Sequence, residues 1–324
     1  MTSIRDIEAA ADRLDGVVVR TPLIENAELD RVAGGKVLVK PECFQAIGSF
    51  KIRGAYNLLS QLTLDQAKRG VVAWSSGNHA QGVALAGKLL GIHAAIVMPE
   101  DAPAAKLENT RRLGGEIITY DRYNEDREAI ARRIAAERGA EIVPSYEDAR
   151  IIAGQGTVGL EIAEQSVEMG FPADQVFICC GGGGLTAGSA IALKARLPDV
   201  DVYPVEPETF DDTARSLATG ERVGVSGDAR SICDALLTDM PGQMTFDIMR
   251  THVVKGLTVS DAEVEDAMRF AFRHLKIVVE PGGAAALAAL LTGKVDTAGK
   301  TTVVVFSGGN VDVEMYAAIQ ANSA

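Results

Sequence analysis

Apolar and polar positions along the chain form two patterns that alternate in order. Between residues 70 and 147, four short apolar runs are separated by three segments whose apolar residues recur three or four positions apart. The short runs are typical of buried strands, and the longer spacing is typical of amphipathic helices. This alternation predicts a compact β-α-β-α-β-α-β unit with a parallel sheet.

The same alternation continues on both sides of this unit. Further strands are predicted at residues 36–42, 175–180, 201–206 and 301–306. Helical periodicity between most of them is typical of connections between parallel strands, whereas residues 213–260 predict mainly loops. We therefore predict an α/β fold with two parallel-sheet domains. The small domain, residues 70–147, is inserted into a large domain formed by residues 1–69 and 148–324.

The composition agrees with this fold and narrows the function. With 324 residues, 47% of them apolar, and 33 glycines, the chain can fill two cores and form short turns. A net charge of −12 argues against nucleic acid or an anionic membrane surface as a partner. No signal sequence or membrane-spanning run is present, so we expect a cytoplasmic protein. The four cysteines lack CxxC spacing and are expected to be reduced.

Residues 48–55, Gly-Ser-Phe-Lys-Ile-Arg-Gly-Ala, contain the first candidate for chemistry. Lys51 lies just before a segment of helical periodicity, between an aromatic residue and glycines that allow close approach of a ligand. An amine that forms a Schiff base must lose its proton near neutral pH. Burial, or a neighbouring cation such as Arg53, would lower the pKa of Lys51 enough for this. A solvated lysine in an ordinary turn is the alternative.

Two polar turns join a predicted strand to a predicted helix. The turn 75–79, Ser-Ser-Gly-Asn-His, would direct backbone N–H groups at a carboxylate or phosphate, or would simply cap the helix. His79 would serve either as a local hydrogen-bonding group or as a catalyst. The turn 181–184 is four consecutive glycines, which suits a phosphate monoester. It is neither the spaced dinucleotide fingerprint nor a Walker loop.

A third turn, after the predicted strand at residues 201–206, is acidic. Glu206, Asp212 and the carbonyl groups between them offer oxygen ligands suited to Mg²⁺ or Ca²⁺. A solvated acidic loop is the alternative reading of the same residues.

Together these turns resemble the fold type II pyridoxal phosphate enzymes, in the branch of the serine/threonine dehydratases and serine racemases, which includes 3-hydroxyaspartate dehydratases. The resemblance extends from Thr21-Pro22-Leu23 to Ser307-Gly308-Gly309-Asn310, with the motifs in the family's order. It implies the fold of the tryptophan synthase β-like enzymes, with the active site in a cleft between the two domains and pyridoxal 5′-phosphate bound by the large one.

The resemblance also implies roles for individual residues. Lys51 would form the Schiff base, Asn78 would hydrogen-bond the ring 3-oxygen, and Ser307 would face the pyridine nitrogen. Ser76 matches the acid/base of the racemases on the face opposite the lysine. The cofactor would contact Phe50, Lys51, Asn78, Gly181, Gly182, Gly183, Gly184, Leu185 and Ser307. The substrate carboxylate would be bound by Ser75, Ser76, Gly77, Asn78, His79 and Ala80.

By the same resemblance, Glu206, the carbonyl of Phe210 and Asp212 match a site for Mg²⁺, Mn²⁺ or Ca²⁺, and the protein is expected to be a homodimer. The implied reaction removes water from threonine, serine or 3-hydroxyaspartate to give a 2-oxo acid and ammonia. A serine or aspartate racemase is the alternative enzyme, and a non-catalytic phosphate-ligand sensor is the alternative of another class. Trp74 and Tyr146 depart from the family pattern and leave the substrate open.

Overall fold

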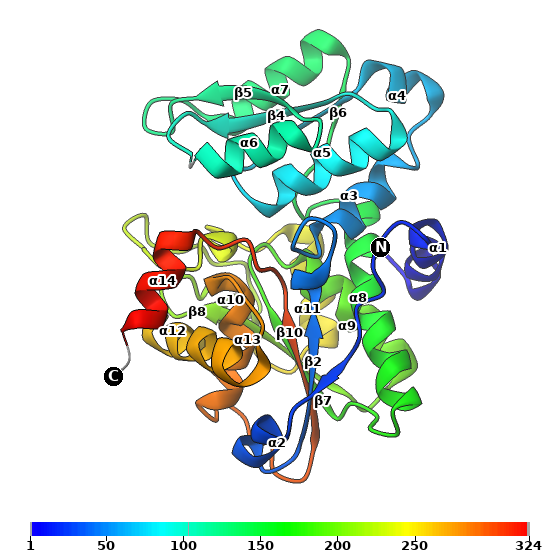
Figure 1. The fold of residues 1–324 in the computed structure, drawn as a ribbon. Helices are drawn as coiled ribbons and strands as arrows, with labels where there is room; N and C mark the ends of the chain where they lie inside the picture. Colours follow the sequence, from blue (N-terminus) through cyan, green and yellow to red (C-terminus); the bar gives the residue numbers. More distant parts are fainter. Residues whose placement is uncertain (1, 103, 323–324) are drawn as a thin grey trace.

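The computed structural model describes residues 2–102 and 104–322, which form two parallel sheets covered by helices (Figure 1). The upper part of Figure 1 holds β3 to β6 with helices α4 to α7, and the lower part holds the remaining strands. This confirms the prediction of an α/β fold with two parallel sheets. The domain boundaries at residues 70 and 147 stay a prediction.

The larger sheet has six strands in the order β1-β2-β10-β7-β8-β9. Every neighbouring pair is parallel except β1 and β2. Its central strands are buried along nearly their whole length, which explains their continuous apolar runs. The strands are β1 (Ile24–Glu25), β2 (Lys36–Pro41), β7 (Gln175–Cys179), β8 (Asp201–Pro207), β9 (Leu257–Val259) and β10 (Thr301–Phe306).

The smaller sheet has four strands in the order β5-β4-β3-β6, and all of its pairs are parallel. Its two central strands are rich in Val, Ala and Ile, and the helices that pack on them bury both faces. The strands are β3 (Val71–Trp74), β4 (Ala94–Pro99), β5 (Glu116–Tyr120) and β6 (Glu141–Ile142).

Helices cover both sheets, and one of them, α3, lies between the two parts in Figure 1. It begins at Lys51, as the periodicity predicts, and packs against α5 above and α8 below. The helices are α1 (Ile4–Leu14), α2 (Ala27–Ala33), α3 (Lys51–Leu59), α4 (Leu64–Arg69), α5 (Asn78–Leu90), α6 (Ala104–Arg112), α7 (Arg127–Arg138), α8 (Ala149–Glu168), α9 (Gly184–Arg196), α10 (Asp212–Thr219), α11 (Gln243–His252), α12 (Asp261–Phe270), α13 (Pro281–Leu291) and α14 (Val313–Ala321), with short turns η1 (Glu42–Phe44), η2 (Asp234–Leu236) and η3 (Ala271–Leu275).

The segment 213–260 is more regular than its sequence predicts, since it contains most of α10, all of α11 and β9. Short elements broken by Gly220, Gly224 and Gly227 leave too few positions for a periodic pattern to be recognised. Within residues 2–102 and 104–322, no helix combines the length and the hydropathy that crossing a membrane requires.

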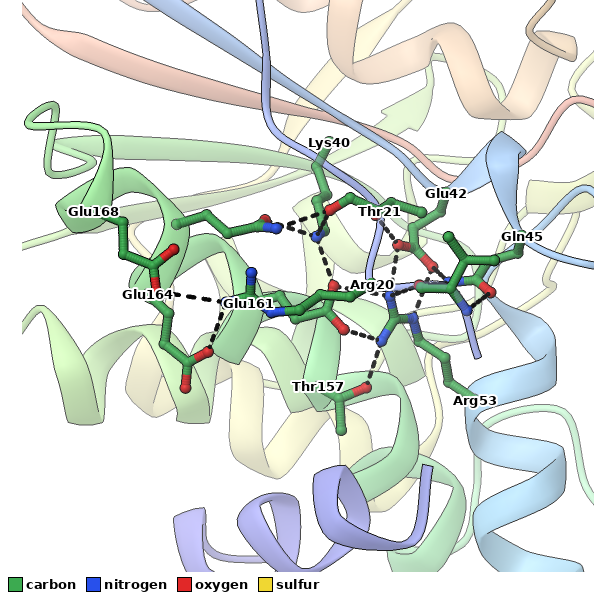
Figure 2. A network of polar contacts seen from close by, with 12 residues as sticks. Arg20, Thr21, Lys40, Glu42, Gln45, Arg53, Thr157, Glu161, Glu164 and Glu168 are labelled. Atoms are coloured by element: carbon green, nitrogen blue, oxygen red, sulfur yellow. Dashed lines mark hydrogen bonds and ion pairs between the residues drawn. The ribbon is translucent and has the colours of Figure 1, made fainter. Parts of the chain in front are cut away.

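A buried ion network fixes the start of α3 to the larger sheet (Figure 2). Arg53 donates to both oxygens of Glu42, at 2.8 and 2.9 Å, and to both oxygens of Glu161, at 2.6 and 3.0 Å. Lys40 donates to Glu161 at 2.6 Å. Arg53, Glu42 and Lys40 are 0% exposed. Because β2 carries Lys40, η1 carries Glu42 and α8 carries Glu161, this network holds α3 against three separate elements.

The charges in this network stabilise one another. Burial alone would lower the pKa of Arg53, but Glu42 and Glu161 raise it above its usual value. Burial would likewise raise the pKa of Glu42, but Arg53 lowers it overall. Both groups therefore stay charged, and the pairing is complete within the protein interior.

Candidate active site

A cavity of about 1360 Å³ lies where α3, α5 and the carboxyl ends of β3, β7 and β10 meet. It brings together all but one of the residues predicted to bind the cofactor or substrate. Ala80 is the exception, because it is 0% exposed and packs in the core beside β3. The cavity is lined by Phe50, Lys51, Ser75, Ser76, Gly77, Asn78, His79, Gly181, Gly182, Gly183, Gly184, Leu185 and Ser307, among others.

Lys51 reaches this cavity from the first turn of α3. Its amine donates to the backbone carbonyl of Ser145 at 3.1 Å and lies 5.2 Å from the centre of the Phe50 ring. Burial lowers the pKa of Lys51 to about 8, although the negative charge of Glu280 opposes this shift. Burial, and not Arg53, is therefore the cause, since Arg53 is occupied by two carboxylates on the far side of the helix.

The turn at residues 75–79 leads from β3 into α5, which begins at Asn78. The amide of Gly77 donates to the Ser75 hydroxyl at 3.2 Å, so the turn is partly ordered by its own side chain. His79 is 3% exposed and its Nε2 lies 2.9 Å from the carbonyl of Val143. Burial, with a contribution from the charge of Lys51, lowers the pKa of His79 to about 3. The imidazole is neutral and serves as a local hydrogen-bonding group.

The glycine turn follows β7 and opens α9, a helix of 13 residues that begins at Gly184. Gly183 has φ of +90°, a backbone angle that residues other than glycine rarely adopt. A Cβ on Gly182 would overlap the ring of Tyr146, which packs directly on this turn. The turn therefore presents bare backbone N–H groups at a helix start, the arrangement that binds phosphate.

Ser307 follows β10 and completes the floor of the cavity beside the lysine. Its carbonyl accepts from the amide of Phe50 at 3.1 Å, and Ser49 pairs with Gly308 in an isolated bridge. The lysine loop is thus attached to the end of a central strand.

The acidic turn lies apart from the cavity, between β8 and α10. Glu206 is 0% exposed, and its two oxygens accept from the amides of Thr213 and Ala214 at 2.9 and 2.8 Å. Asp212 is 1% exposed, and its Oδ2 has no hydrogen-bond partner among the residues that the structure describes. Burial, followed by the charge of Asp212, raises the pKa of Glu206 well above its usual value, and burial raises that of Asp212 to about 7.

These groups fit a hard cation, since an unpartnered buried carboxylate oxygen and a second carboxylate nearby both gain from a positive charge. Within the described parts of the chain, no set of three or more His, Cys, Asp or Glu side chains is arranged to hold a metal. Any site here must therefore rely on two carboxylates together with backbone carbonyls such as that of Phe210.

Some residues at the cavity were missed by sequence reasoning. Glu280 lines the cavity, is 2% exposed and accepts from Asn78 at 2.6 Å. Arg127 lines it from the start of α7, in a helix whose charged residues suggest only a solvated face. Neither lies in a strand-end turn, so no local pattern distinguishes them from ordinary surface or loop residues. Tyr146, which departs from the family pattern, lies against the glycine turn.

Comparison with known proteins identifies the family and several relatives of this chain. The family model described as "Pyridoxal-phosphate dependent enzyme" matches residues 14–308. The L-threo-3-hydroxyaspartate ammonia-lyase of Pseudomonas sp is 46% identical over 98% of both chains. The serine racemase of Schizosaccharomyces pombe is 43% identical over 96% of this chain and 95% of its own. The crystal structure of a threonine deaminase from T.th. superposes with a TM-score of 0.89, at 41% identity, over 96% of this chain and 99% of the other.

The chain belongs to the pyridoxal phosphate-dependent enzyme family, and its fold is that of fold type II. Within the family its relatives are the hydroxyaspartate and threonine ammonia-lyases and the serine racemases, as the motifs predict. Membership in a family of enzymes removes the alternative of a non-catalytic phosphate sensor.

Proposed function

We propose that this protein is an ammonia-lyase that removes water from a β-hydroxy amino acid, with L-threo-3-hydroxyaspartate as its foremost substrate. The observation that carries the proposal is the cavity itself. It joins in one space an amine of lowered pKa and two turns at helix starts, residues 75–79 and 181–184, which are suited to a carboxylate and a phosphate. These three features are what elimination from an amino acid bound to pyridoxal phosphate requires.

When bound, pyridoxal phosphate supplies an electron sink that stabilises negative charge on the substrate Cα. Lys51 would hold the cofactor covalently, and the backbone N–H groups of residues 181–185 would hold its phosphate. Phe50 would pack against the ring, and Ser307 would face its nitrogen as a neutral partner. The turn 75–79 would bind the substrate carboxylate and fix Cα beside Lys51.

Lys51 would then act as the base that takes the α-proton, because a pKa of about 8 leaves a substantial fraction of its amine uncharged near neutral pH. Loss of that proton and of the β-hydroxyl as water leaves a carbon–carbon double bond next to the amino group. The released enamine becomes an imine, and water hydrolyses it to a 2-oxo acid and ammonia.

The distal carboxylate of 3-hydroxyaspartate needs a cation, since burying it unpaired would cost several kcal/mol. Several cations line the cavity, but Lys106, Arg132 and Arg150 already pair with carboxylates. Arg222 has no carboxylate partner among the described residues, but its guanidinium already donates to the Pro241 carbonyl at 2.8 Å and to Gln243 Oε1 at 3.1 Å. Arg127 lines the cavity too, and among the residues that the structure describes no carboxylate lies within ion-pair distance of it. We therefore propose Arg127 as the partner of the distal carboxylate.

The test compares kcat/KM for L-threo-3-hydroxyaspartate, L-threonine and L-serine in the wild type and in Arg127→Gln. The matched control is Arg132→Gln, on the same helix but paired with Glu128. We expect Arg127→Gln to reduce the preference for hydroxyaspartate by roughly tenfold or more, because one carboxylate pair is lost. If the wild-type protein prefers L-threonine and does not convert L-threo-3-hydroxyaspartate, the choice of substrate is wrong.

A racemase activity is the second candidate, and the position of Ser76 in the cavity favours it. A proton delivered to Cα from the face opposite Lys51 would invert the amino acid. Ser76→Ala should then reduce formation of D-serine or D-aspartate more than elimination from the L-substrate. Equal loss of both activities would assign Ser76 to substrate binding alone.

We also propose that Glu206, Asp212 and the Phe210 carbonyl bind Mg²⁺, Mn²⁺ or Ca²⁺, supported by the unpartnered Asp212 oxygen. We propose a cytoplasmic location, which the four free cysteines support, and a homodimer. Phe272, in ring contact with Tyr316 of α14, is 46% exposed, and Val313 is 76% exposed, so this face offers apolar area to a second copy. Light scattering of the purified protein would decide the oligomeric state.

A further inference from the structure

Three polar side chains from separate parts of the chain form a line of hydrogen bonds at the edge of the cavity. Asn310 donates to the backbone carbonyl of Ile47 at 2.7 Å and to the amide oxygen of Asn78 at 2.6 Å. Asn78 in turn donates to Glu280 Oε1 at 2.6 Å. All three side chains line the cavity that contains Lys51.

The direction of these bonds is set by the backbone. A carbonyl such as that of Ile47 can only accept, so the amide nitrogen of Asn310 must face it. The same nitrogen then reaches the oxygen of Asn78, which turns the nitrogen of Asn78 towards Glu280. Glu280 must therefore offer an oxygen without a proton. Because an amide nitrogen carries two hydrogens and Glu280 accepts one, a second N–H of Asn78 remains available.

The space around Glu280 is shaped for this contact. The side chain is 2% exposed, and a Cβ on residue 308 would overlap its Oε1. Only glycine at position 308 leaves room for the carboxylate, and the amide of Glu280 donates to the Gly308 carbonyl at 3.1 Å. The backbone of Glu280 is thus attached to residue 308, and its carboxylate is held by Asn78.

We propose that Glu280 is a positioning residue: its carboxylate holds the amide of Asn78 in one orientation for the cofactor ring oxygen, and it places a negative charge in the same cavity as the amine of Lys51. The proposal rests on the cofactor that family membership gives, and not on the choice of substrate. It extends to Asn310, which fixes the other end of the Asn78 amide.

The electrostatics at this point involve several groups. Burial raises the pKa of Glu280 to about 7, and the charge of Asp234 adds to this, while Asn78 and Lys106 oppose it. Glu280 in turn opposes the lowering of the Lys51 pKa. The titratable groups that interact electrostatically with Glu280 are Cys43, Lys51, Lys106, Cys179 and Asp234, which come from several neighbouring elements. Lys51 is the one among them that the cofactor uses.

Two substitutions separate the two roles. Glu280→Gln keeps an acceptor oxygen for Asn78 but removes the charge, whereas Glu280→Ala removes both. The control is Glu28→Gln, which removes a carboxylate from an exposed pair with Arg31. For each apoprotein, two quantities are measured by absorbance in the absence of amino acid. One is the dissociation constant of pyridoxal phosphate, and the other is the capture midpoint, which is the pH at which half of the cofactor is covalently attached to the protein.

We expect Glu280→Gln to bind pyridoxal phosphate nearly as tightly as the wild type, with the capture midpoint about one pH unit lower, because a carboxylate no longer stabilises the Lys51 ammonium. Glu280→Ala should show the same shift and, in addition, a dissociation constant raised roughly tenfold or more, since Asn78 then has no acceptor oxygen at this position. The control should match the wild type in both measurements.

An unchanged midpoint in Glu280→Gln, or equal affinities of Glu280→Gln and Glu280→Ala, would overturn the proposal. If Glu280→Ala does not fold, Asn310→Ala replaces it and should weaken cofactor binding without moving the midpoint. Unaltered binding in Asn310→Ala would then overturn it. Since no substrate is present, these results do not depend on whether the protein is an ammonia-lyase.

Discussion

Lys51 and Arg53 lie two residues apart in the first turn of α3, yet the protein treats these two cations in opposite ways. Arg53 is 0% exposed and donates four hydrogen bonds to two carboxylates. Lys51 faces the cavity and has one backbone carbonyl as its hydrogen-bond partner among the described residues. Both side chains are buried, but Glu42 and Glu161 keep Arg53 charged, whereas burial brings the pKa of Lys51 down to about 8.

The difference teaches that counter-charges, more than burial itself, decide what a buried cation can do. A paired cation stays charged and holds elements together, whereas an unpaired one can lose its proton and react. The same contrast separates the network of Figure 2 from Asp212, whose buried oxygen has no partner in the described part of the chain.

The largest effect should come from Lys51→Ala. Turnover of the holoenzyme should fall by roughly a thousandfold or more, because by our proposal one group both binds the cofactor and takes the α-proton. The melting curve of the apoprotein should stay cooperative. Lys68→Ala, which removes an exposed lysine, is the control. A Lys51→Ala protein that keeps more than a trace of activity would end the assignment of this residue.

Arg53→Gln should reveal the structural side of the comparison. Leaving Glu42 buried without its hydrogen-bonded cation, and Glu161 with Lys40 alone, should reduce the free energy of unfolding by roughly 3–5 kcal/mol. Arg132→Gln, in an exposed pair with Glu128, should cost at most about 0.5 kcal/mol. Urea unfolding of both variants measures the difference. Similar stabilities for the two would show that the network is not what holds α3.

Removal of divalent metal should destabilise the region around the buried carboxylates of Glu206 and Asp212. A chelator should lower the melting temperature, and Mg²⁺, Mn²⁺ or Ca²⁺ should restore it. At a hundredfold excess over its dissociation constant, the metal should raise the free energy of unfolding by about 2.7 kcal/mol. Asp212→Asn should abolish the response. A melting curve that ignores the chelator, with no metal found by elemental analysis, would remove this site.

The smallest effect is a pH dependence of apoprotein stability. The folded pKa of Lys51, about 8, lies below that of an unfolded lysine, so the unfolded chain holds more protons between these values. Stability from this group should therefore rise with pH above about 8, by at most about 1.4 kcal/mol per pH unit. The difference between wild type and Lys51→Met in urea unfolding from pH 7 to 10 isolates it. Arg53 contributes no such slope, because its pKa is raised. A difference that does not change across this range would mean that Lys51 titrates normally.

Much of this site could be predicted from the sequence because its parts are local. The lysine loop, the turn 75–79 and the glycine turn each follow a strand within a few residues, and parallel strands bring their carboxyl ends together. The apolar runs likewise predicted both sheets. The residue roles, the metal site and the domain boundaries remain predictions.

What the sequence could not provide are the partners from distant segments. Arg53 and Glu161 are 108 residues apart, and Asn78 and Glu280 are 202 apart. No periodicity or spacing connects such residues, since their contact depends on how the helices pack on the sheets. The suggestion that Arg53 lowers the Lys51 pKa is wrong for this reason, because its carboxylate partners on η1 and α8 cannot be recognised as such in the sequence.

The lysine loop is anchored to the end of β10 through Ser307 and Gly308, whereas the turn 75–79 and Arg127 come from the smaller sheet and its helices. In the function proposed above, one half of the molecule would therefore support Lys51, and the other half would carry the groups that contact the amino acid. Mutations in the second half can alter substrate choice while the support of Lys51 stays intact. Such a division gives evolution, or an engineer, a surface to vary without rebuilding the chemistry.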